Sequence, residues 1–179
     1  MYEFSDIDDL VSHVRGAGYR RVGIDGVNGV GKSTLAKELS RRLGCRLLSL
    51  DEFLEKNQGG FVEHLKYSEL SADISSHKSF VIEGVCLLEV LRRLKTEIEF
   101  LVYIKKQQHG LWADERECEI EGDVEEFIAK ERELVKQLSR LEGSSEETDT
   151  LGLGEEIIRY HASHRPHNKA NAIFWRNDC

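Results

Sequence analysis

The feature that most constrains the fold is the stretch GVNGVGKST at residues 26–34, a short loop with three glycines. The apolar run RRVGID precedes it, and a helical pattern with Leu35, Leu39 and Leu43 follows. Residues four apart share one face of a helix, so the loop is expected to join a β-strand to an amphipathic helix over 32–43. A strand, a glycine-rich loop and a helix in this order indicate an α/β fold.

The rest of the chain continues this alternation of strands and helices. Helical patterns separate apolar runs that predict four more strands, at 45–50, 79–82, 99–104 and 172–175. Helices are expected over 4–14, 62–76, 85–94, 123–141 and 157–163. This order predicts a three-layer fold, a parallel sheet of five strands with helices on both faces. Such sheets bind ligands at the carboxyl ends of their strands, where Asp25, Asp51 and Glu83 are expected.

Residues 105–164 differ from the rest, because polar residues dominate and no strand is expected there. The segment 142–154 is rich in Gly, Ser, Thr and acidic residues without periodicity, so a solvated and mobile loop is expected. Pro166 should end the helix before it. We therefore expect one domain over 1–179 with a helical excursion at about 105–164.

The charge balance excludes several partners. The sequence has 25 basic and 33 acidic side chains, a formal net charge of −8, which argues against broad contacts with nucleic acid or an anionic membrane. The start, MYEFSDIDDL, does not resemble a signal peptide, and no apolar run approaches the roughly 20 residues that span a bilayer. The four cysteines form no C-x-x-C pair and are expected to be reduced thiols. A cytoplasmic protein is the expectation.

The glycine loop matches the pattern G-x-x-x-x-G-K-[ST] of phosphate-binding loops. Glycines let backbone N–H groups converge on a phosphate, the lysine provides a charge for the β- and γ-oxygens, and the serine hydroxyl can bind Mg²⁺. A structural turn is the weaker alternative. We expect the loop to bind a nucleoside triphosphate through Gly26, Asn28, Gly29, Val30, Gly31, Lys32, Ser33 and Thr34.

Two acidic residues at strand ends are candidates for chemistry beside this loop. Asp51 could accept a proton from a substrate hydroxyl or hold Mg²⁺, or it could only cap a helix. Glu83 stands where P-loop proteins usually place the Walker B carboxylate near the metal, although Asp is more usual there. Ser33, Asp51 and Glu83 are thus the predicted Mg²⁺ ligands. For Asp25 we favour a structural role, in which it accepts backbone N–H bonds of the loop.

Four stretches together resemble one branch of the P-loop kinases. They are IDGVNGVGKST, SLDEF, FVIEG and RYHASHRPHNKANAIF, and the branch is that of uridine kinase and phosphoribulokinase-like enzymes. The resemblance spans most of residues 20–175. It implies a helical lid and transfer of the ATP γ-phosphoryl group to a hydroxyl of a small molecule. It further implies that Asp51 is the base, that Glu83 acts on Mg²⁺ or its waters, and that Lys32 acts on the migrating charge.

The sequence also departs from this family. The family's lid is rich in arginine, whereas Arg116 is the only arginine in residues 105–123. Arg116 is still expected to contact the nucleotide, as is Arg165 near the lid base, although a solvated basic surface explains Arg165 equally well. His161, His164 and His167 are spaced by three, but Pro166 interrupts them and a metal site is the weaker reading. Little chain follows the last strand, so Asn177 and its neighbours are candidates for the adenine pocket.

The main hypothesis is an ATP- and Mg²⁺-dependent small-molecule kinase with a nucleoside-like or related acceptor. The alternative is a nucleotide switch or ATPase module that acts through a protein partner. The loop 57–60, beside Asp51, offers room for an acceptor and favours the kinase. A GTPase switch would have an N-K-x-D-like motif that recognises guanine, and this sequence has none. Neither the acceptor nor the oligomeric state follows from the sequence.

Overall fold

The computed structural model describes residues 1–55, 60–141 and 151–177, and its centre is a parallel β-sheet. The strands are β1 (Tyr2–Phe4), β2 (Arg21–Asp25), β3 (Arg46–Ser49), β4 (Phe80–Glu83), β5 (Phe100–Gln108), β6 (Leu111–Trp112) and β7 (Ala172–Asn177). Their order is β1, β7, β5, β2, β4, β3, and every neighbour in this row is parallel. Only β6 is antiparallel, paired with the end of β5. The expected α/β fold is therefore confirmed.

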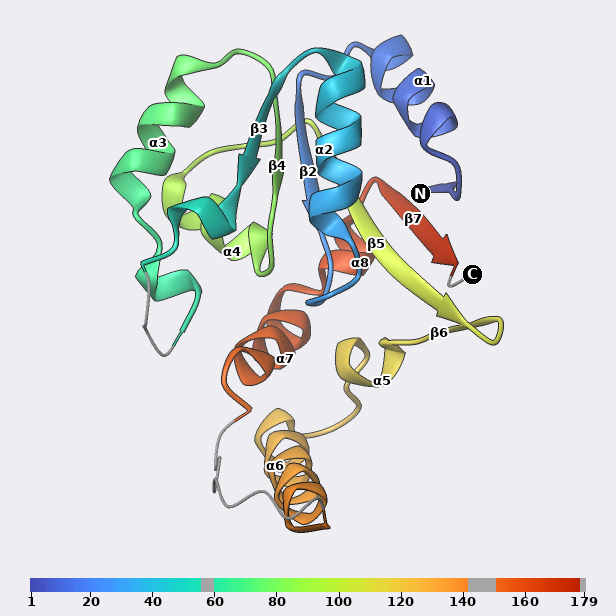
Figure 1. The fold of residues 1–179 in the computed structure, drawn as a ribbon, viewed down its shortest axis with the longest axis vertical. Coiled ribbons are helices and arrows are strands. Elements are labelled where there is room, and N and C mark those ends of the chain that lie inside the picture. The colour runs from blue at the N-terminus through green and yellow to red at the C-terminus, as the bar shows by residue number, and fades with distance from the viewer. Residues whose placement is uncertain (56–59, 142–150, 178–179) are drawn as a thin grey trace.

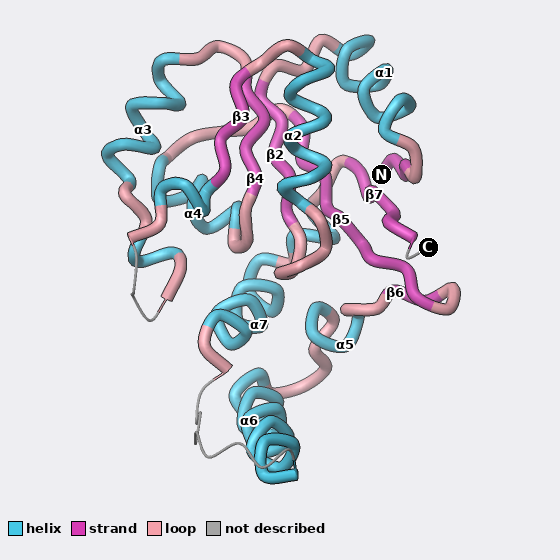
Figure 2. The backbone as a smooth tube through the Cα atoms, in the orientation of Figure 1, coloured by secondary structure: helices cyan, strands magenta, loops and turns pink. Residues whose placement is uncertain are grey.

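Helices cover both faces of this sheet, and some lie beyond the carboxyl ends of its strands. They are α1 (Ile7–Ala17), α2 (Lys32–Leu43), α3 (Tyr67–Ser76), α4 (Leu87–Leu94), α5 (Glu115–Cys118), α6 (Val124–Leu141), α7 (Leu153–His164) and α8 (Pro166–Lys169), with 3-10 turns η1 (Leu50–Phe53) and η2 (Val62–His64). Figure 1 shows α2 in front of the sheet and α8 behind it. Helices α5, α6 and α7 lie beyond the carboxyl ends of the strands (Figure 2), where the lid was expected.

The central strands are buried on both sides, as their unbroken apolar runs predict. In β4 all four side chains are buried, and in β5 the first five are. Glycine is required at Gly23 in β2, because an ideal Cβ there would lie 2.5 Å from Ile98 Cδ1 and 3.0 Å from Leu87 Cδ2. The sheet thus forms a rigid platform under the strand ends that carry the candidate site.

The sheet contains two strands that the sequence reading missed. Residues 2–4 were partly assigned to the first helix, but that helix begins only at Ile7, after Asp6 caps it by accepting the N–H of Asp8. The residues before the cap pair with β7 as β1. The expectation of no strand within residues 105–164 was also wrong, because β5 continues to Gln108 and the chain then turns into β6. The turn residues His109 and Gly110 both have positive φ, as a tight two-residue hairpin requires.

Two other expectations concern helix boundaries. The single helix over 62–76 is wrong, since an extended Leu65 that bridges Leu54 separates η2 from α3. Pro166 does end the preceding helix, since α7 stops at His164 and the proline begins α8. The predicted mobile loop 142–154 lies mostly outside the described residues, as do residues 57–59 of the acceptor loop.

Among the described residues, no helix is long and apolar enough to span a membrane. The location in the cytoplasm and the division of the chain into one domain with an excursion stay predictions.

Candidate functional site

The phosphate-binding loop connects β2 to α2 and adopts a conformation that depends on its glycines. Gly29 and Gly31 have φ of 77° and 92°, in the left-handed region that other residues rarely adopt. Gly31 is the residue before α2, so the free N–H groups of the first helical turn face the loop. The positive end of the helix and these N–H groups together favour an anion.

Lys32 is the charged centre of this loop. Its side chain is buried, with 7% of the residue exposed, and Nζ donates to the carbonyl oxygen of Val27 at 2.7 Å. Burial lowers the pKa of Lys32, while the carboxylates of Asp25, Glu83 and Asp51 act in the opposite direction. Among the residues that the structure describes, the hydrogen-bond partner of this buried ammonium group is a neutral carbonyl, an arrangement that suits an incoming phosphate.

A cavity of about 370 Å³ opens above the loop and gathers most of the predicted site residues. It is lined by Asn28, Gly29, Gly31, Lys32, Ser33, Thr34, Asp51, Glu83, Gly84, Val85, Leu153 and Arg176. We call it the phosphate cavity. Gly26 and Val30 do not line it, although Gly26 precedes the loop directly. An ideal Cβ on Gly26 would lie 3.2 Å from the carbonyl oxygen of Ile104, so this glycine allows close packing instead.

The two acids of the phosphate cavity occupy different environments. Glu83 ends β4, is 2% exposed and accepts a hydrogen bond from the Ser49 hydroxyl, which fixes its carboxylate. Asp51 lies in η1 with an exposed side chain and makes no capping hydrogen bond there. The structure therefore does not support the alternative in which Asp51 only caps a helix. The hydroxyl of Ser33 and these two carboxylates are hard oxygen donors of the kind that Mg²⁺ prefers, and the donor set thus fits this metal.

Asp25 has the structural role that we favoured for it. It is completely buried, its Oδ1 accepts the backbone N–H of Gly26 at 2.7 Å, and its Oδ2 accepts the hydroxyl of Tyr160. The Tyr160 oxygen also accepts the N–H of Leu88 at 3.1 Å. Burial raises the pKa of Asp25 to about 6, although Tyr160 and Gly26 partly offset this by hydrogen bonding. The start of the phosphate loop is thereby tied to α7 and α4.

The two arginines proposed from the lid region lie elsewhere. Arg116 in α5 is largely exposed, with 68% of its side chain accessible, and it forms an ion pair with Glu131 of α6. Arg165 occupies a left-handed backbone conformation between α7 and α8. Neither lines the phosphate cavity. Their contact with a nucleotide stays a prediction.

One cation of the phosphate cavity was missed. Arg176, in the last strand, lines the cavity beside Lys32, and its Nη1 donates to the carbonyl oxygen of Val30 at 3.0 Å. The sequence reading considered Asn177 and its neighbours for the base, but nothing in the local pattern marked this arginine. Only the parallel pairing of β7 with β5 carries it to the loop.

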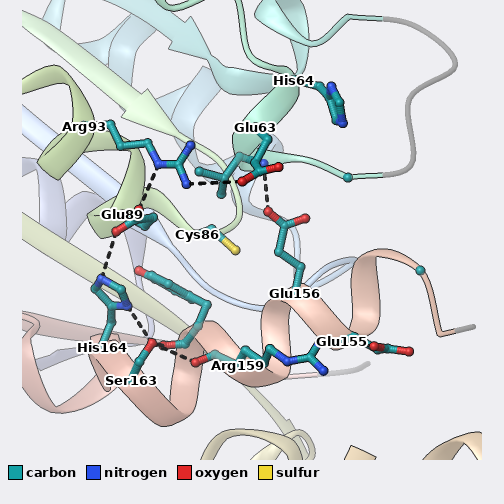
Figure 3. Close-up of a pocket in the computed structure, with 14 residues that line it drawn as sticks. Glu63, His64, Cys86, Glu89, Arg93, Glu155, Glu156, Arg159, Ser163 and His164 are labelled. Atoms are coloured by element: carbon teal, nitrogen blue, oxygen red, sulfur yellow. Dashed lines mark hydrogen bonds and ion pairs between the residues drawn. The ribbon is translucent and has the colours of Figure 1, made fainter.

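A second cavity, of about 570 Å³, adjoins the first and is drawn in Figure 3. We call it the acceptor cavity. Val85 and Leu153 line the phosphate cavity, and their chain neighbours Cys86 and Gly152 line this one. The acceptor cavity is enclosed mainly by η2, α4 and α7.

Ion pairs occupy the charged groups in the wall of the acceptor cavity. Arg93 binds Glu89 at 2.9 Å and lies 4.0 Å from Glu63. Arg159 binds Glu125 at 2.8 Å and Glu155 at 3.1 Å. Figure 3 shows Glu156 reaching from α7 toward η2, where its oxygens accept the N–H groups of Phe61 and Val62, both at 2.8 Å.

The three histidines of the late stretch have separate partners. His161 is buried between the Tyr103 hydroxyl and the carbonyl of Ile157, and burial lowers its pKa to about 4, so the ring is neutral. His164 faces Glu89, and His167 faces Glu119. In the described part of the chain, no group of three His, Cys, Asp or Glu residues is placed to hold a metal ion.

Comparison with known proteins gives a local family match. The family model for shikimate kinase matches residues 28–67, which contain the phosphate loop from Asn28 onward and Asp51. No curated protein matches the chain. A solved structure described as a possible uridine kinase from Bacillus stearothermophilus is similar over 94% of this chain and 96% of its own, with 17% identity and a TM-score of 0.48.

Two shikimate kinase structures are also similar. The enzyme from Acinetobacter baumannii, in complex with shikimate, is 16% identical over 90% of this chain and 86% of its own, with a TM-score of 0.45. That from Bacteroides thetaiotaomicron is 17% identical over 87% and 85%, with a TM-score of 0.40. This chain thus has a parallel sheet with a phosphate loop after β2, and its local family match is to a small-molecule kinase.

Proposed function

We propose that this protein is an ATP- and Mg²⁺-dependent phosphotransferase that moves the γ-phosphoryl group to a hydroxyl of a small molecule. The observation that carries the proposal is the phosphate cavity, which Lys32 and Ser33 of the loop line together with Glu83 at the end of β4 and Asp51 in η1, just after the neighbouring strand β3. An adjoining cavity offers space for an acceptor, which a nucleotide switch does not need.

Each residue has a chemical role in this proposal. The loop N–H groups and Lys32 bind the β- and γ-phosphates, and Lys32 stabilises the negative charge of the transferring group. Asp51 is exposed at the cavity, so its carboxylate is free to orient the acceptor hydroxyl and accept its proton. Ser33 and Glu83 hold Mg²⁺ or its waters. The metal, when bound, neutralises phosphate charge.

The acceptor cavity favours an uncharged acceptor, as in a uridine kinase-like enzyme. The two arginines that line it, Arg93 and Arg159, each already face two carboxylates. An anionic acceptor such as shikimate needs a cation for its carboxylate, and binding to one of these arginines would compete with the ion pairs that it already forms. Hydroxyls and amides can instead bond to carboxylate oxygens. A nucleoside or a related neutral polyol is therefore the acceptor class that we propose.

An acceptor screen tests this function. ATP consumption should be measured with uridine, with orotidine, which adds a carboxylate to the same nucleoside, and with shikimate. We expect turnover with uridine and little with orotidine or shikimate. Turnover of shikimate or orotidine in preference to uridine would contradict the acceptor class.

A variant of the proposed base tests the reaction itself. Asp51→Asn should abolish turnover but retain ATP binding, because the amide cannot accept the proton. Glu52→Gln serves as the matched control, since it removes the exposed carboxylate next to Asp51 that does not line the phosphate cavity, and it should keep wild-type turnover. Normal turnover by Asp51→Asn would show that the base is wrong. Intact ATP binding with no turnover of any acceptor would favour the switch or ATPase module.

A further inference from the structure

We propose that Arg176 holds the nucleotide at the point where its phosphates join the nucleoside, and so provides from a strand the cation that the arginine-poor lid does not place there. This inference rests on the proposed nucleotide site but not on phosphoryl transfer. Arg176 would be a direct ligand of the α-phosphate.

The guanidinium group of Arg176 packs against the phosphate loop at Gly31. An ideal Cβ on Gly31 would fall 1.6 Å from Nη1 and 2.8 Å from Cζ of Arg176. Glycine is therefore needed at position 31 both for its φ of 92° and to admit this side chain. The hydrogen bond from Nη1 to the carbonyl of Val30 holds the group in place.

Arg176 also stands at the junction of two cavities with different chemistry. The phosphate cavity and a smaller one of about 240 Å³ share Gly31, Thr34 and Arg176. Apolar side chains from four elements line the smaller cavity, namely Ile7, Leu35, Ile104 and Phe174. Glu38 also lines it. A polyanion suits the first cavity and a flat apolar ring suits the second. If one nucleotide occupies both cavities, its α-phosphate lies beside the residues that the two cavities share.

The charge of Arg176 is available for such a ligand. Its hydrogen bond goes to the neutral carbonyl of Val30, and within residues 1–55, 60–141 and 151–177 no carboxylate forms an ion pair with it. Two cations of residues 105–123 are engaged in other contacts. Arg116 is paired with Glu131, and the Lys105 ammonium lies 3.7 Å from the centre of the Trp112 ring. Guanidinium is well suited to bind two phosphate oxygens at once.

The position of Arg176 on strand β7 determines what nucleotide binding requires. Strand β7 pairs with β5 along six residues, including Lys106 with Arg176, so the side chain is anchored on the sheet and not on the helices α5 to α7. Binding of the α-phosphate then does not require a lid to close. ADP and ATP share the α-phosphate and should depend on Arg176 equally.

Binding measurements with Arg176→Gln test the proposal. By isothermal titration with Mg²⁺, we expect ATP and ADP to bind about tenfold more weakly to this variant, as the loss of a hydrogen bond to a charged group predicts. Inorganic tripolyphosphate, which lacks the nucleoside, should lose less. Arg176→Lys should recover part of the affinity. The matched control Arg20→Gln removes an exposed arginine directly before β2, at the opposite end of this strand from the phosphate loop, and should change affinity less than twofold.

The results separate this inference from the proposed function. Unchanged ATP binding by Arg176→Gln, or a larger loss in Arg20→Gln, would overturn the role of Arg176. A change confined to ATP, with ADP unaffected, would also overturn it, because the contact would then be to the γ-phosphate. If the wild-type protein binds ATP but phosphorylates no acceptor, the proposed kinase activity is refuted. The role of Arg176 is then still decided by the binding of ATP and ADP to the variants. Arg176 is exposed, so the glutamine variant should keep the wild-type melting temperature.

Discussion

Replacing Tyr160 by phenylalanine should destabilise the protein, and the loss should be larger at pH 8 than at pH 5. The substitution keeps the ring in the wall of the acceptor cavity but removes the hydroxyl. That hydroxyl donates to the buried carboxylate of Asp25 and accepts the N–H of Leu88. Both partners would be left without this bond.

The size and sign of the effect follow from the pKa of Asp25. This pKa is raised from 3.8 to about 6, so stability falls as pH rises between these values, by about 3 kcal/mol at 1.36 kcal/mol per pH unit. Tyr160 lowers the pKa of Asp25, so the variant should have a still higher value, and its stability should keep falling above pH 6. At pH 5 the carboxyl group is largely protonated in both folded proteins, and the variant loses only about 1 kcal/mol from neutral hydrogen bonds. At pH 8 the loss should reach about 2–3 kcal/mol.

Urea unfolding followed by fluorescence at pH 5, 6, 7 and 8 measures this difference, at low protein concentration because the isoelectric point is near 5.4. Tyr67→Phe is the matched control. Its hydroxyl donates to the neutral carbonyl oxygen of Val62 at 2.7 Å, so its cost should not depend on pH. If Tyr160→Phe cost the same free energy at pH 5 and pH 8, the assignment of a charged, buried Asp25 to this bond would be refuted.

Three further predictions concern the loop, the core and the lid. Lys32→Ala should abolish phosphoryl transfer while circular dichroism shows an intact fold, and transfer near the wild-type rate would contradict its role. Gly84→Ala should cost about 1–3 kcal/mol in unfolding free energy, since a Cβ would come within 2.6–2.8 Å of the buried Leu50 side chain; an unchanged urea midpoint would be inconsistent with this packing. Residues 105–123 should exchange amide hydrogens more slowly with ATP and Mg²⁺ bound, and identical exchange would argue against a closing lid.

Local sequence patterns were sufficient for most of the fold. Unbroken apolar runs and leucines four residues apart placed the five main strands and α2, because burial of apolar side chains imposes those periods wherever the partners lie. The errors lie where local signals compete with distant pairing. Residues 2–4 form β1 because β7 lies beside them, although their side chains also fit the pattern of a helix.

The candidate site divides in the same way. The sequence by itself determined the phosphate loop, because its glycines, Lys32 and Ser33 act through local backbone geometry, and it placed Asp51 and Glu83 near it through the general rule for parallel sheets. Only the tertiary structure brought Arg176 onto Gly31 and Tyr160 onto Asp25, across 145 and 135 residues. No local pattern encodes such contacts. They arise because strand register and helix packing fix which distant side chains share a cavity, and that cavity holds the charges that decide what the site can bind.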